Sequence, residues 1–401
     1  MSNRALIAAA TALAFLPAIE ARAEDGAASL VQRLESPIEI GDSEHFLRLS
    51  PFVQFDGGWA SSRPDDLVSP EDRRNGEIRR GRLYADFGYG DLGGRLTLDF
   101  ANWQDAAVTY AYLNYEISEA LTVQAGYQDV PFSLQNLMGS RSATFAEDGL
   151  NATLQLADAV GVAALAGGER WSFQTGVFGG DINAQPFDDG VTLASRATYA
   201  PYLEGEDAVH LGLAVAAGID RREPLSFSGG VGSDLVSASP VSTDDFAGSS
   251  NLVSVNAELA ATLGRFTLQS EYTVSRVDAS RGGEATLQGG YLSALVFLTE
   301  DHRRYDAKGG QFERVKPAHS LSDGGIGAFE IGARLDALDL TDARLQSGGK
   351  AGAEVAGTAI LNWYPTDILR FTASHTYTRV TSGEDRGDHV NATLLRAAII
   401  Y

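Results

Sequence analysis

The sequence predicts an all-β fold, a 16-stranded antiparallel barrel that crosses a membrane. Three observations lead to this prediction. The chain ends in an alternating strand, residues 389–401, whose last residue is the aromatic Tyr401. The amino terminus has the pattern of a secretory signal, and the region between contains many segments that alternate apolar and polar residues. No segment approaches the roughly 18 apolar residues of a spanning helix, and without helices only a closed barrel satisfies the backbone in lipid.

The first 23 residues are predicted to be a signal peptide. Arg4 supplies the positive charge, residues 5–16 form an apolar core, and Ala21 and Ala23 flank a small-residue cleavage site. Residues 24–45 are expected to be a short periplasmic lead, most simply a flexible tail. Residues 46–401 then form the barrel domain.

The alternation of side chains identifies the strands. In residues 79–89, four apolar or aromatic residues from Leu83 onward alternate with Arg80, Arg82, Tyr84 and Asp86. Such a segment presents one face to lipid and the other to water. The same pattern occurs at 47–55, 95–100, 121–128 and 265–272, around Tyr112, Val162, Phe173, Arg196, Leu213, Val255, Leu295, Ile331, Leu361 and Phe371, and in the final strand.

A secreted β-sandwich shares this period, because each of its strands also has one buried face. The signal peptide and the aromatic residues near strand ends favour the barrel. The connections agree: short turns such as 90–94 alternate with long polar segments at about 60–76, 130–156, 219–250 and 300–325. This is the arrangement of short periplasmic turns and long extracellular loops. The aromatic residues are Trp59, Trp103, Trp171, Tyr199, Trp363 and Tyr401.

Composition narrows the possible partners. Asp and Glu number 53 and Lys and Arg 31, so the formal charge is −22, which excludes a general attraction to nucleic acid. The absence of cysteine suits an oxidising periplasmic route. No cofactor is expected, and no metal site is assigned, because the acidic loop residues lack a defined ligand spacing.

From about residue 46 to its end, the chain resembles the phosphate- and polyphosphate-selective porins O and P of Gram-negative outer membranes. The resemblance implies a trimeric 16-stranded barrel in the outer membrane, whose loop after Pro131 and Phe132 folds inward as a constriction. It implies passage of small inorganic anions such as phosphate and chloride, contact with lipid and lipopolysaccharide, and insertion by the barrel assembly machinery. The segments that carry it are residues 78–87, 111–115, 126–134, 144–145, 176–180, 198–201, 297–306, 314–317 and 361–365.

Arginine suits the inner wall of such a pore because its planar fork offers two donors to an oxyanion. Alternation predicts that Arg48, Arg80, Arg82, Arg95, Arg196, Arg265, Arg334 and Arg370 face the lumen. They are candidates either for anion contact or for a ladder of salt bridges with Asp86, Asp99, Glu271 and Asp336. Arg80, Arg82 and Arg141 are the first candidates for contact. The wider set of anion-binding or pore-lining candidates adds Ser140, Asn136, Arg48, Arg196, Lys308 and Lys316.

The constriction segment departs from the family pattern. Asn136 stands where the family has a basic residue, and Glu147-Asp148 where it commonly has Glu-Arg. A general porin of weak or cationic selectivity therefore stays open as an alternative, as does a structural barrel. An enzymatic barrel is disfavoured because Ser374 and His375 are adjacent in a predicted strand and point to opposite faces.

Overall fold

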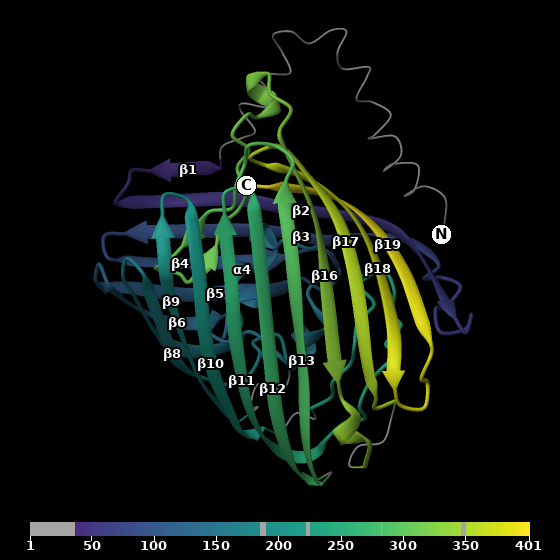
Figure 1. The fold of residues 1–401 in the computed structure, drawn as a ribbon. Helices are drawn as coiled ribbons and strands as arrows, with labels where there is room; N and C mark the ends of the chain where they lie inside the picture. Colours follow the sequence, from purple (N-terminus) through teal and green to yellow (C-terminus); the bar gives the residue numbers. More distant parts are fainter. Residues whose placement is uncertain (1–36, 185–189, 222–224, 282, 346–349) are drawn as a thin grey trace.

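One antiparallel sheet closes on itself to form a barrel of 16 strands (Figure 1). The computed structural model describes residues 37–184, 190–221, 225–281, 283–345 and 350–401. The barrel strands are β2 (His45–Arg63), β3 (Arg74–Tyr89), β4 (Leu92–Asp99), β5 (Ala107–Ser118), β6 (Leu121–Gln128), β7 (Ala159–Gly167), β8 (Trp171–Phe178), β9 (Val191–Glu204), β10 (Asp207–Arg221), β11 (Ala247–Leu263), β12 (Phe266–Arg281), β13 (Gly283–Phe297), β16 (Ala328–Asp339), β17 (Ala353–Thr366), β18 (Leu369–Ser382) and β19 (His389–Ile400).

The first and last barrel strands close the sheet. β19 pairs with β2 from His389 opposite Arg63 to Ile400 opposite Phe52. Each of the sixteen segments predicted from alternation is a strand, so the predicted fold class is confirmed.

The amino-terminal lead is partly described. Its residues Ile38–Gly41 form strand β1, which pairs with the start of β2. The expected flexible tail is therefore wrong for this short stretch. The signal peptide and the rest of the lead lie outside the described residues.

The connections differ between the two ends of the barrel. We call the end where β19 stops the turn end, and the opposite end the loop end. Most turn-end connections are short, as predicted, but residues 298–327 join β13 to β16 at this end. This segment contains the small hairpin of β14 (Tyr305–Asp306) and β15 (Gln311–Phe312). The prediction that every long connection lies at one end is therefore wrong for this one.

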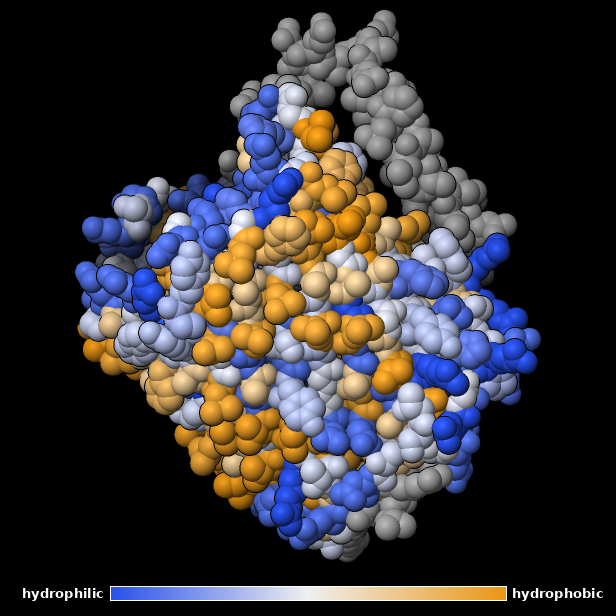
Figure 2. All heavy atoms as spheres, in the orientation of Figure 1, coloured by the Kyte–Doolittle hydropathy of each residue, from blue (hydrophilic) through white to orange (hydrophobic). Residues whose placement is uncertain are grey.

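The outer wall is apolar and the inner wall is largely polar. Strand β10 shows the alternation: Leu211, Leu213 and Val215 are exposed outside, whereas His210 and Ala214 are buried inside. Figure 2 shows apolar residues gathered on the outer surface seen in this view. None of the helices in the described ranges is long and apolar enough to cross a membrane.

The connection between β6 and β7, residues 129–158, folds into the barrel, as expected. It contains helix α4 (Leu134–Ser142) and the short 3₁₀ helix η1 (Leu150–Leu154). Leu134 and Met138 of α4 pack with Ala260 of β11 and Phe312 of β15. We call residues 129–158 the inner loop. It therefore packs against both the barrel wall and the hairpin that enters from the turn end.

Candidate functional site

A carboxylate of the barrel wall anchors the beginning of α4. Glu271 on β12 accepts hydrogen bonds from the Ser133 hydroxyl at 2.7 Å, the Leu134 amide at 3.1 Å and the Gln135 amide at 2.8 Å. The free amides and positive dipole end of a helix N-terminus favour such an anion. Glu271, a predicted salt-bridge partner for the arginines, instead holds the loop.

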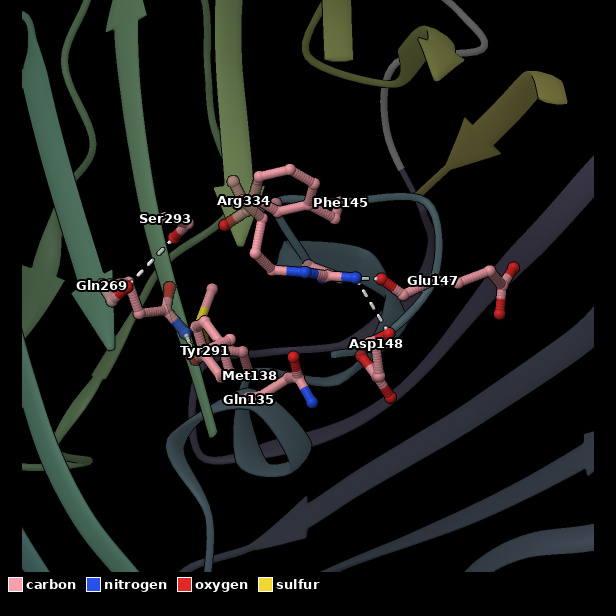
Figure 3. Close-up of a pocket in the computed structure, with 11 residues that line it drawn as sticks. Gln135, Met138, Phe145, Glu147, Asp148, Gln269, Tyr291, Ser293 and Arg334 are labelled. Carbon is pink, nitrogen blue, oxygen red and sulfur yellow. Dashed lines mark hydrogen bonds between the residues drawn. The ribbon is translucent and has the colours of Figure 1, made fainter. Parts of the chain in front are cut away.

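Three wall arginines anchor the following stretch through its carbonyl oxygens. Arg370 donates to the carbonyls of residues 143 and 144, and Arg396 to that of residue 146. Arg334 donates to the carbonyl oxygens of Glu147 and Asp148 at 2.9 and 3.0 Å, as Figure 3 shows. Arg334 and Arg370 face the lumen as predicted. Their donors are largely occupied by the loop, so they serve mainly to position it.

The space left beside the inner loop is a cavity of about 770 Å³ along the β3–β6 side of the lumen. Eight arginines and four acidic residues line it, although the whole chain carries a charge of −22. Positive charge is thus concentrated in the space that the inner loop leaves inside the barrel. The arginines are Arg79, Arg80, Arg82, Arg95, Arg141, Arg314, Arg370 and Arg396, and the acids are Asp129, Glu147, Asp148 and Asp158.

A β-bulge places two consecutive arginines inside the lumen. Arg80 is paired with Gln54 and Ile78 with Phe55, so Arg79 is the extra residue of β3. Such an insertion breaks the alternation of faces. Strict alternation therefore missed Arg79 as a lining residue. The adjacency of Arg79 and Arg80 in a strand was the available signal.

The lining arginines differ in whether an acid already neutralises them. Arg82 forms a salt bridge with Asp99 at 2.8 Å, and Arg95 with Asp86 at 2.6 Å. These two pairs join neighbouring strands and match the predicted ladder of cross-strand salt bridges. Arg334 also pairs with Asp336 at 2.9 Å, but both residues lie on β16, so this pair is not a cross-strand one.

Four arginines of the cavity make no salt bridge with a described carboxylate: Arg80, Arg141, Arg314 and Arg370, the last of which is held by carbonyl oxygens of the loop. Arg80 donates to the side-chain oxygen of Gln54 at 2.7 Å, and Arg314 to the carbonyl oxygen of Ile400 at 2.8 Å. The Arg141 guanidinium lies 4.6 Å from the centre of the Tyr84 ring. Burial lowers the pKa of Arg141 from its ordinary value, and the positive charge of Arg314 acts in the same direction. An anion between these cations relieves that repulsion.

Helix α4 presents the other loop candidates to the same cavity. Asn136 and Ser140 both line it. The helix is interrupted at Gly139, whose φ of 60° is left-handed, and this turns the segment that carries Ser140 and Arg141.

Four residues of the predicted anion-binding or pore-lining set, Arg48, Arg196, Lys308 and Lys316, do not line this cavity. Arg48 pairs with Glu39 of β1 at 2.7 Å, outside the cavity. Arg196 is fully buried against Glu258, with contacts of 2.8 and 2.7 Å. Lys308 and Lys316 are exposed in the turn-end connection. Arg265, predicted to face the lumen, is exposed in a turn before β12.

Two carboxyls lie side by side just beyond the ends of β6 and β7, at the two ends of the inner loop. Asp129 accepts a hydrogen bond from the Tyr110 hydroxyl at 3.1 Å. Burial raises the pKa of Asp129, and the neighbouring Asp158 raises it further. Burial also raises the pKa of Asp158. The pair therefore holds a proton to higher pH than an ordinary aspartate pair.

Comparisons with known proteins place this geometry in a family. The family model for phosphate-selective porins O and P matches residues 71–401. An uncharacterized protein of Caulobacter vibrioides is 30% identical over 346 residues, which are 80% of this chain and 66% of that protein. Porin O of Pseudomonas aeruginosa is 25% identical over 334 residues, 72% of each chain.

The solved structures that match share the fold. OmpT, an outer membrane protein of Vibrio cholerae, aligns with a TM-score of 0.58 at 12% identity, covering 90% of this chain and 99% of that one. An anion-selective porin from Comamonas acidovorans aligns with a TM-score of 0.53 at 10% identity, covering 89% and 100%. The chain belongs to the phosphate-selective porin O and P family, and its closed barrel is that of an outer-membrane passive channel.

Proposed function

We propose that this porin is a diffusion channel selective for small inorganic anions, phosphate among them. The observation that carries the proposal is the cavity beside the inner loop, where eight arginines face four acids. Four of these arginines, Arg80, Arg141, Arg314 and Arg370, have no carboxylate partner among the described residues, and the loop carbonyls already occupy donors of Arg370. At an effective dielectric constant of about 20, one unit charge at about 4 Å contributes roughly 4 kcal/mol. The balance of charge in this cavity therefore outweighs the acidity of the chain as a whole.

The chemistry suits an oxyanion that loses part of its water. Desolvation is costly unless donors replace the lost hydrogen bonds, and guanidinium groups give the strongest replacements. The hydroxyl of Ser140 and the amide of Asn136 add neutral donors beside Arg141. Because the cations are spread along the cavity, the ion meets several weak sites rather than one tight site, as conduction requires.

Other aspects of the proposal rest on the family. Porin O and the anion-selective Comamonas porin support anion passage, and a trimer form of Vibrio OmpT supports a homotrimer. We also propose export by the signal peptide of residues 1–23, insertion by the barrel assembly machinery, and lipopolysaccharide contact at the outer face.

Reversal potentials in planar bilayers test the selectivity, with the purified protein in gradients of potassium chloride and potassium phosphate. We expect an anion preference that falls in Arg80→Ala and Arg141→Ala. Arg265→Ala removes an equal charge from an exposed turn and serves as the control.

A cation preference in the wild type would refute the proposal and favour the alternative of a cationic porin. Asp148 favours that alternative, because its side chain is exposed and lines the cavity.

A further inference from the structure

A carboxylate of the inner loop fills a position between two guanidinium groups. Glu147 Oε1 lies 2.5 Å from Arg396 Nη2 of β19, and its Oε2 lies 3.3 Å from Arg79 Nη2 of β3. The side chain of Glu147 is 16% exposed. The two oxygens of one carboxylate thus bridge two strands on either side of the seam where the barrel closes.

The surroundings of this position are basic on the cavity side. Arg80, the residue after Arg79, attracts Glu147 electrostatically and makes no salt bridge with a described carboxylate. Arg79, Arg80, Arg396 and Glu147 all line the 770 Å³ cavity. Behind them, Arg396 binds both oxygens of Asp56 at 2.7 and 2.6 Å, which fixes its guanidinium. Arg79 likewise has a second acid partner, since its Nε lies 3.3 Å from Asp234 Oδ2. Both guanidinium groups that hold Glu147 therefore have a partner besides Glu147.

We propose that Arg79, Arg80 and Arg396 form an oxyanion-binding position, and that Glu147 occupies it as a tethered substitute for a permeating anion. The inference deepens the proposed function and rests on it. A carboxylate offers the same paired oxygens as phosphate to an arginine fork. Because Glu147 is part of the chain, its effective concentration at this position is high, and a free anion must compete with it. The tethered carboxylate weakens anion binding here and so keeps release fast.

The neighbouring acid provides a matched control. Asp148 carries the same charge on the same loop, yet its carboxylate makes no salt bridge with a described residue, and only its backbone oxygen contacts Arg334. Asp148→Asn therefore removes one negative charge from the cavity without emptying the position. Glu147→Gln removes one negative charge and the competing anion together.

The experiment measures how much inorganic phosphate halves the chloride conductance of single channels. For Glu147→Gln we expect this concentration to fall by about a hundredfold, the low end of the effect that tethering has on competition at one site. Asp148→Asn should shift it far less. Adding Arg79→Gln to Glu147→Gln should restore the wild-type concentration. Equal shifts in the two single variants, or no shift in Glu147→Gln, would overturn the inference.

A second variant guards against misfolding. Glu147→Asp keeps the charge but is one methylene shorter and cannot bridge both arginines as before, so its half-blocking concentration should lie between wild type and Glu147→Gln. A value equal to that of the wild type would count against the inference. A wild type that prefers cations refutes the proposed function itself, whereas an anion-selective wild type with an unresponsive Glu147→Gln refutes only the tethered substitute.

Discussion

Replacing Glu271 by glutamine should loosen the inner loop without disturbing the barrel. The Glu271 carboxylate accepts five hydrogen bonds: three from the start of α4, one from Asn256 at 2.9 Å and one from the Tyr291 hydroxyl at 2.8 Å. Glutamine has one acceptor oxygen, and its amide nitrogen only donates. At least one amide of the helix N-terminus then faces another donor and loses its acceptor.

The magnitude follows from these contacts. A hydrogen bond to a charged group contributes about 1.5–3 kcal/mol, and the interaction of the charge with the helix dipole adds about 0.3–1 kcal/mol. We expect the anchored state of the loop to lose about 3 kcal/mol, which is roughly a hundredfold change in the ratio of anchored to released loop.

Two measurements report this change. Single-channel recordings of Glu271→Gln should show a higher and noisier conductance, and limited proteolysis should cut the inner loop faster. Tyr291→Phe is the control, because it removes one hydrogen bond to the same carboxylate but none to the loop. If Glu271→Gln keeps the wild-type conductance and protease resistance, the anchoring role assigned to Glu271 is wrong.

Three further predictions concern charge. Arg80→Ala should raise the half-blocking phosphate concentration more than Arg82→Ala, because Asp99 already binds the guanidinium of Arg82. The double variant with both changes should lower the anion-to-cation permeability ratio. Equal effects of the two single variants on phosphate block would contradict this reasoning. Arg196→Ala should leave a buried carboxylate without its arginine and destabilise the barrel by about 3–5 kcal/mol, seen as a lower unfolding temperature in detergent with unchanged selectivity. The pKa values of Asp129 and Asp158 are raised above the ordinary aspartate value of 3.8, so the pair stays protonated, and less negative, to higher pH than ordinary aspartates. The anion-to-cation permeability ratio should therefore fall as the pH rises through these raised pKa values. Asp129→Asn should abolish this pH dependence.

The strands were predictable because each one meets the same physical demand. A strand between lipid and water must alternate, and that period is recognisable in all sixteen barrel strands, although the bulge at Arg79 interrupts it in β3. The inner faces were less predictable than the outer ones. On β10, Ala214 and Ala216 face inward and are buried in an apolar cluster with Leu150 and Leu154 of the inner loop. Polarity marks an inner face only where water, rather than the loop, covers it.

The site was predictable in residue type but not in role. Alternation correctly placed Arg80, Arg82, Arg334 and Arg370 inside the barrel. The alternation pattern did not indicate which acceptor each arginine would bind, because the acceptors lie in distant segments of the chain. Arg370, for example, donates to a carbonyl oxygen 227 residues earlier in the chain. Arg79 was hidden for a different reason, since a one-residue bulge leaves no regular signature in a single sequence.

The two acids of the inner loop show why counting charges in a motif misjudges a pore. As sequence, Glu147 and Asp148 appear equivalent, and both seem to oppose anion passage. In the fold, Arg79 and Arg396 outweigh the effect of burial and lower the pKa of Glu147, so its charge is kept and neutralised by partners. For Asp148, desolvation inside the barrel and the adjacent Glu147 raise the pKa, although the side chain itself is exposed to the cavity. Selectivity thus depends on the charges that lack a partner of opposite charge, and among the described residues of the cavity these are Arg80, Arg141, Arg314 and Arg370 against Asp148 and the Asp129–Asp158 pair.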